Sequence, residues 1–101
     1  MTMTLTCEES EGRRRVCLAG ESAFETAGEL RAILLDSLHS ETPSAVDFAA
    51  AAELDLGLVQ VVLSARRTFA ARGVQFTVLD SQGGPWERWL AAVGIGGDSD
   101  E

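Results

Sequence analysis

The chain has 101 residues, of which 46% are hydrophobic and 24% charged, as expected for one globular domain with a modest core. Its 16 acidic residues outnumber its 8 basic ones, all arginines, and the formal net charge is −8. Because nucleic acids and anionic membranes require a basic face, this charge argues against both as partners. No apolar run approaches the ~20 residues of a membrane span. The N-terminus lacks the features of a signal peptide, so we expect a cytoplasmic protein.

Two short strands are predicted at the start of the chain. Thr2 to Cys7 alternates threonine with apolar side chains, and Arg14 to Gly20 is the second strand. These segments should form an antiparallel hairpin, with the triplet Arg13-Arg14-Arg15 in a solvated turn. Cys7 and Cys17 then lie on neighbouring strands, where two small buried side chains are a better interpretation than a disulfide.

A helix is predicted to begin at Thr26, which forms a capping box with Glu29. Leu35 lies outside the apolar stripe of this helix, and His39 falls in its last turn. No nucleophile or orienting carboxylate accompanies His39, so we assign it no catalytic role. The stripe itself recurs at helical spacing and consists of Leu30, Ile33, Leu34 and Leu38.

The stretch from Ser44 to Gly73 is the centre of the predicted fold. It indicates a short buried strand from Ala45 to Phe48 and then a tight loop or single turn through Ala49 to Ala52. A long helix follows, with Asp55 placed to cap it and Gly73 to end it.

This long helix carries more apolar surface than one buried face requires. Val59 and Leu63 lie off its apolar stripe, at positions that are normally polar. Either neighbours bury the helix on several sides, or its N-terminal end is a docking surface. The stripe consists of Leu58, Val62, Ala65 and Phe69.

The remaining sequence predicts a strand from Val74 to Leu79 and a helix from Pro85 to Gly94. The polar tail, residues 96–101, is expected to be an acidic disordered segment that follows a single domain spanning residues 1–95. The predicted order is therefore β-β-α-β-α-β-α. It indicates an α/β fold in which helices pack on one face of a small mixed sheet.

Several motifs occur in a characteristic order. The central ones are Val46-Asp47-Phe48, the run Asp55-Leu56-Gly57-Leu58-Val59-Gln60, and the basic pair Arg66-Arg67. The outer ones are Leu18 to Glu21, Thr26 to Arg31, and Trp89 to Ile95. Together they resemble the STAS domain, the fold of anti-sigma-factor antagonists and of the cytoplasmic tails of sulfate transporters. The resemblance covers residues 3 to 95 and implies the STAS fold.

The resemblance places a functional surface at the start of the Asp55 helix. In regulatory STAS proteins, a kinase-like partner phosphorylates a Ser or Thr just after this aspartate, and the added charge of about −2 switches the contact. Here Leu56 and Gly57 form a degenerate phosphorylation site that lacks a hydroxyl, so we expect constitutive binding. The expected partner-binding residues are Asp55, Leu56, Gly57, Leu58, Val59, Gln60 and Leu63.

The function implied is a non-enzymatic protein–protein interaction module. One version is an anti-sigma-factor antagonist or STAS regulator that binds an anti-sigma factor, a histidine-kinase-like ATPase. Another is the STAS subunit of a phospholipid-trafficking ABC transporter, which binds the transporter ATPase. A homodimer and an apolar ligand against Leu56 and Val59 are further alternatives. No catalytic residue or cofactor is expected, and two cysteines with one histidine lack the spacing of a metal site.

Overall fold

The computed structural model describes residues 4–21 and 25–92. Within that part, the predicted element order β-β-α-β-α-β-α and the mixed sheet are confirmed. The predicted helix end at Gly94, the tail and the domain boundary at residue 95 lie outside the described residues. The elements are β1 (Thr4–Ser10), β2 (Arg13–Glu21), α1 (Thr26–His39), β3 (Ser44–Glu53), α2 (Leu56–Ala71), β4 (Phe76–Leu79) and α3 (Pro85–Ala92).

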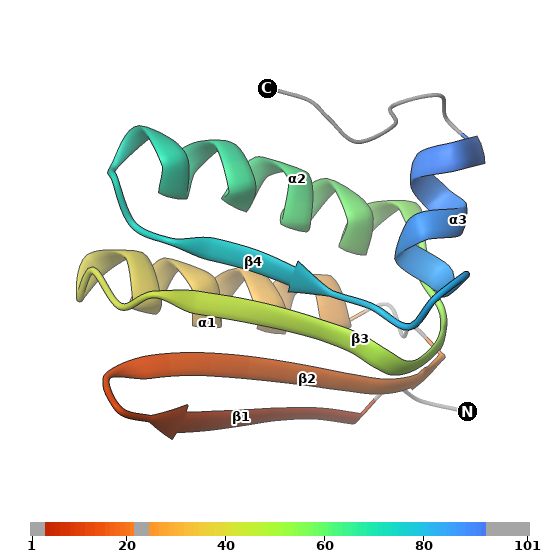
Figure 1. Ribbon diagram of the computed structural model, residues 1–101, viewed down its shortest axis with the longest axis horizontal. Helices are drawn as coiled ribbons and strands as arrows, with labels where there is room; N and C mark the ends of the chain where they lie inside the picture. Colours follow the sequence, from red (N-terminus) through yellow and green to blue (C-terminus); the bar gives the residue numbers. More distant parts are fainter. Residues whose placement is uncertain (1–3, 22–24, 93–101) are drawn as a thin grey trace.

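The four strands lie in the order β1-β2-β3-β4 (Figure 1). β1 and β2 are antiparallel, whereas β2, β3 and β4 run parallel to one another. Ser10 pairs with Arg13, so the hairpin turn is the two residues Glu11 and Gly12. Both have positive φ angles, 54° and 76°, which matches the twist of a tight hairpin.

The three arginines after this turn lie in β2, so the prediction of a solvated turn is wrong. Because side chains alternate along a strand, Arg14 points towards the helices, whereas Arg13 and Arg15 lie on the opposite face. Arg14 donates hydrogen bonds to the Asp36 carboxylate and to the Ser37 hydroxyl, both at 2.9 Å. It thereby connects the hairpin to α1.

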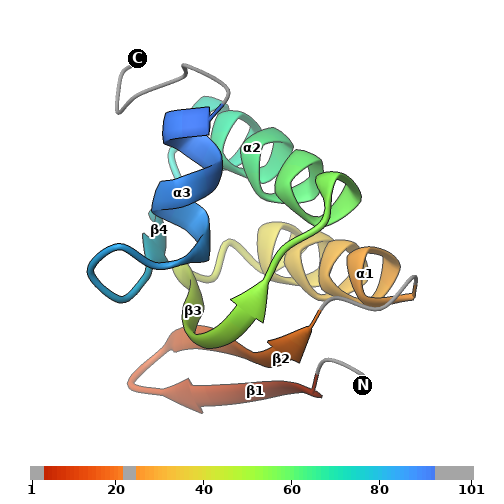
Figure 2. The same cartoon turned by 90° about the vertical axis from the view of Figure 1, so that its right-hand side faces the viewer.

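α1 and α2 lie side by side against one face of the sheet, and α3 stands beside the end of β3 (Figure 2). α1 begins at Thr26, but Glu25 rather than Thr26 holds the N-cap position, without a side-chain capping bond. The core between the helices and the sheet includes Val16, Leu18, Leu30, Leu34, Leu38, Val46, Phe48, Leu58, Val62 and Phe69.

β3 is much longer than predicted, because Ala49 to Ala52 continue the strand rather than form a loop. Their backbone pairs with β2, with Ala50 opposite Ala19 and Ala51 opposite Gly20. A register shift between Asp47 and Ala50 shows that β3 carries a bulge there. Backbone pairing with a neighbouring strand therefore overrides the intrinsic helical preference of alanine.

α3 is fixed to the rest of the molecule by its two tryptophans. Trp86 is buried and stacks on Phe48 with ring centroids 5.8 Å apart, while the Arg66 guanidinium lies 5.7 Å from the Trp86 ring. The Trp89 indole N–H donates to the Leu54 carbonyl at 2.7 Å. This bond holds the connection between β3 and α2.

Both cysteines are free, and they are not directly opposite each other. Cys17 is half-buried, but Cys7 is exposed on the edge strand β1, so the prediction that both are buried is wrong for Cys7. Partial desolvation still raises the pKa of the Cys7 thiol above its ordinary value.

Candidate functional site

The predicted cap at the start of α2 is present. Asp55 has an extended backbone with φ −94° and ψ 170°, and its Oδ1 accepts a hydrogen bond from the Leu58 N–H at 2.8 Å. Its backbone carbonyl accepts the Val59 N–H at 3.1 Å. The side-chain bond satisfies a free N–H group of the first turn, and the carbonyl bond is the first regular bond of the helix, so α2 begins at a defined residue.

The residues that follow the cap are presented to solvent. Leu56 is 54% exposed, the highest value among the large hydrophobic side chains that the structure describes. Gly57 and Gln60 are exposed as well. Four of the seven expected partner-binding residues, Asp55 included, therefore form one accessible surface.

The other three predicted contacts do not belong to this surface. Leu58 is 1% exposed and Val59 is 3% exposed, so neither can touch a partner in the folded protein. Leu63 is half-buried and packs against the core. α2 packs on the sheet and on α1 at the same time, which explains why its first turns are apolar on more than one side.

Gly57 lies where the first turns of α1 and α2 meet. A Cβ atom added to Gly57 would lie 3.8 Å from the Cβ of Ala27 and 3.6 Å from Asp55 Oδ1, which are ordinary contact distances. Packing therefore leaves room for a serine or alanine at this position, and the absence of a hydroxyl is not imposed by the fold.

The surroundings of Leu56 are acidic. Asp55 is exposed directly before it, Glu53 is exposed at the end of β3, and Glu29 is exposed in the first turn of α1. Next to the β3–α2 connection, a hollow of about 330 Å³ includes Glu53, Trp89 and Arg88 in its lining. An apolar side chain within an acidic surface suits contact with a protein that carries basic residues.

A groove between α1 and α2 was missed by the sequence analysis. Leu35, which is 43% exposed, and Arg31 line it from α1. The one available signal was Leu35, a fifth apolar residue outside the predicted helix stripe. We call this feature the interhelical groove.

The sheet face opposite the two helices carries a separate polar cluster. Asp47 is 7% exposed and accepts hydrogen bonds from Arg15 Nε at 3.1 Å and from the Ala49 N–H at 2.8 Å. Burial alone raises the pKa of Asp47, but the Ala49 N–H and the Arg15 guanidinium outweigh it and hold the pKa below its ordinary value. The carboxylate therefore stays charged as a structural partner of Arg15.

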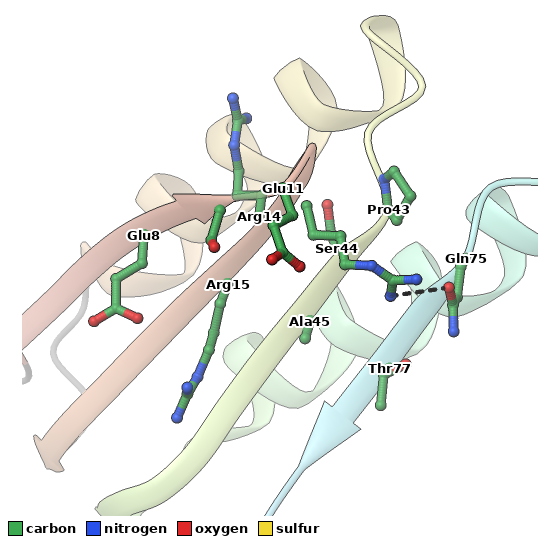
Figure 3. Close-up of a pocket in the computed structure, with 11 residues that line it drawn as sticks. Glu8, Glu11, Arg14, Arg15, Pro43, Ser44, Ala45, Gln75 and Thr77 are labelled. Carbon is green, nitrogen blue, oxygen red and sulfur yellow. Dashed lines mark hydrogen bonds between the residues drawn. The ribbon is translucent and has the colours of Figure 1, made fainter.

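A pocket of about 310 Å³ opens near the hairpin turn, as Figure 3 shows. Across it, Arg13 Nη1 donates to Gln75 Oε1 at 3.3 Å, and Glu8 and Glu11 contribute negative charge. With both signs of charge in its lining, this pocket favours neither an anion nor a cation.

Within residues 4–21 and 25–92, no three His, Cys, Asp or Glu side chains are placed to bind a metal ion. None of the helices in the same part of the chain has the length and apolar character needed to cross a membrane.

No protein-family profile matches the chain, and no curated protein matches it in sequence. Solved structures do. An anti-sigma factor antagonist from Mycobacterium paratuberculosis superposes with a TM-score of 0.76 at 20% identity, covering 93% of this chain and 80% of that one. The anti-sigma factor antagonist SpoIIAA in its unphosphorylated form gives a TM-score of 0.69 at 19% identity, with 92% and 99% covered.

A third structure, the antisigma-factor antagonist STAS domain from Rhodobacter sphaeroides, gives a TM-score of 0.56 at 21% identity, over 76% of this chain and 85% of that one. In the first two comparisons the agreement covers 93% and 92% of the present chain. This protein therefore has the fold of the STAS-domain anti-sigma-factor antagonists.

Proposed function

We propose that this chain is a non-enzymatic regulatory module that binds a protein partner through the start of α2, in the manner of an anti-sigma-factor antagonist. We further propose that it binds constitutively, because Leu56 and Gly57 replace the hydroxyl that a kinase-like partner would phosphorylate. The partner class is an anti-sigma factor of the histidine-kinase-like ATPase type.

The single observation that carries this proposal is the exposure of Leu56. It is 54% exposed on a helix in which Leu58 and Val59 are buried, and it directly follows the capping residue Asp55. Burying apolar surface contributes roughly 25 cal/mol per Å², so covering this side chain would stabilise a complex.

The test is binding to the anti-sigma factors encoded in the same genome, each purified and titrated against the full chain. We expect one of them to bind, and Leu56→Asp to weaken that binding at least about tenfold, a loss typical of a central interface residue. Leu79→Asp is the matched control, because Leu79 is 39% exposed but lies on β4, in the sheet.

The same mixture also tests constitutive binding. After incubation with ATP, intact-mass analysis should show no stoichiometric addition of phosphate to the chain. Phosphorylation at Ser64, the next hydroxyl along α2, accompanied by release of the partner would contradict this half of the proposal.

A further inference from the structure

Most of the interhelical groove lies beyond the proposed binding surface at the start of α2. It runs along α2 from Gly57 to Phe69 and has a volume of about 350 Å³. At 1.5 Å per residue this stretch of helix is about 18 Å long, equal to roughly three turns of a second helix. Buried side chains of Leu34, Leu38 and Phe69 form its apolar floor.

The two walls of the groove differ in chemistry. On α2, Gln60, Ser64 and Thr68 form a neutral polar row at one-turn spacing. On α1, Leu35 is 43% exposed beside Arg31. A binding site for a small ligand normally encloses most of the ligand's surface. Here the exposed Leu35 offers an open apolar wall, which suits a larger partner better.

Arg31 is the one charged residue in the lining of the groove. It forms no hydrogen bond or ion pair with any residue in the described part of the chain, although other arginines do. In a protein of net charge −8, an unpaired guanidinium beside an apolar floor is locally complementary to a carboxylate.

The groove is also continuous with the proposed binding surface. Gly57 is the first α2 residue in its lining and directly follows Leu56, so a partner that covers Leu56 lies next to the groove. We propose that this partner lays an amphipathic helix in the interhelical groove. Its apolar side chains, at i, i+3 or i+4, and i+7, cover the floor, and one carboxylate pairs with Arg31. This inference rests on the proposed function, because it describes how the same partner continues along the molecule.

Site-specific photo-cross-linking tests the geometry. The photoreactive residue p-benzoylphenylalanine is placed at Ser64 in the groove, at Leu56 on the proposed surface, and at Ala70, which is exposed on α2 but does not line the groove. The full chain is irradiated in its native host, and mass spectrometry identifies the cross-linked peptides. We expect Ser64 and Leu56 to capture one protein. The peptide at Ser64 should have helical apolar spacing and an acidic residue, and Ala70 should not capture that protein.

A charge exchange then tests the pairing with the captured partner. Arg31→Glu should weaken binding roughly tenfold or more, and exchange of the partner's carboxylate for arginine should restore it. Arg67→Glu is the matched control, since Arg67 is exposed on α2 outside the groove and its reversal should change the affinity little. Unchanged melting temperatures establish that the variants remain folded.

The outcomes separate this inference from the proposed function. Capture at Leu56 without capture at Ser64 overturns the helix-in-groove inference and leaves the proposed function standing. Capture at neither position overturns both. If Ser64 captures a second copy of this chain, or a peptide without helical apolar spacing and a carboxylate, the occupant proposed here is wrong.

Discussion

Leu56 and Val59 are three residues apart on α2 but have opposite environments, 54% and 3% exposed. An aspartate at position 59 would bury an unpaired charge, which costs several kcal/mol. We therefore expect Val59→Asp to unfold the domain. Leu56→Asp should keep the Tm within about 4 °C of wild type, as for a surface change. Thermal melts followed by circular dichroism make the comparison, and an equal loss in both variants would show that Leu56 is part of the core.

Asp47 should make stability depend on pH. Its folded-state pKa is lowered below its unfolded value of about 3.9, so its contribution is present above that pH and is lost as the pH falls through the lower folded pKa. Asp47→Asn should lower the free energy of unfolding by about 1–3 kcal/mol at pH 7, because a charged hydrogen-bond acceptor is lost. Urea titrations from pH 7 to pH 3 should show the two proteins converging at the acidic end. If the difference in the free energy of unfolding between the two proteins stays constant with pH, the charge of the carboxylate does not contribute to stability.

At this scale the sequence predicted the N-cap of α2 at Asp55 correctly, but it placed the N-cap of α1 at Thr26 instead of Glu25. Asp55 was identifiable because a carboxylate before an apolar helix has one common local role, and that role depends on its own first turn. Val59 was misassigned because its burial depends on two neighbours, the sheet and α1, which helical periodicity does not reveal. Arg31 and Leu35 became visible as a groove only when α1 and α2 were placed side by side.

At the scale of whole elements, Arg14 adds polar contacts between the hairpin and α1 to the apolar packing between them. Its side chain is 12% exposed and bonds to Glu9, Asp36 and Ser37. Arg14→Ala should lower the free energy of unfolding by about 1–3 kcal/mol, since the buried Ser37 and two carboxylates lose a charged donor. Arg13→Ala, which removes one long exposed bond, should change it by no more than about 0.5 kcal/mol. Urea unfolding of both variants measures these changes, and equal losses of free energy of unfolding would refute the role given to Arg14.

β3 marks the limit of what local sequence can say about an element. Val46 and Phe48 predicted a strand because these apolar residues alternate around Asp47, whereas Ala49 to Ala52 have no side-chain pattern that distinguishes strand from turn. Their strand conformation depends on backbone pairing with β2 beyond the bulge. Long-range hydrogen bonding of this kind is invisible in a window of neighbouring residues.

For the whole molecule, the alternation of strands and helices was sufficient to predict the architecture. Short connections between β2, α1, β3, α2 and β4 permit few arrangements other than parallel strands with helices on one face. This element order fits the STAS fold independently of the motif match that carries the resemblance, so the two lines of inference agree on the fold.

The charge of the whole molecule leads to a solubility prediction. The sequence pI is about 4.5, and the net charge of −8 at pH 7 falls towards zero as the pH approaches it. Mutual repulsion then disappears, so light scattering measured from pH 7.5 to 3.5 should show a maximum of association near pH 4.5. Leu56→Asp should reduce that maximum if Leu56 is the main apolar contact between colliding molecules, and leave it unchanged if other surfaces associate.

The indole of Trp89 gives the protein an optical reporter next to its proposed binding surface. Its N–H is held by the Leu54 carbonyl, one residue before the α2 cap, and the ring is half-buried, whereas Trp86 is buried against Phe48. The fluorescence of Trp86 should therefore stay constant on binding. The fluorescence of Trp89 should change in wavelength and intensity when a partner covers this end of the molecule. With Trp89→Phe as the blank, the unlabelled chain can be titrated with each candidate partner in a fluorimeter.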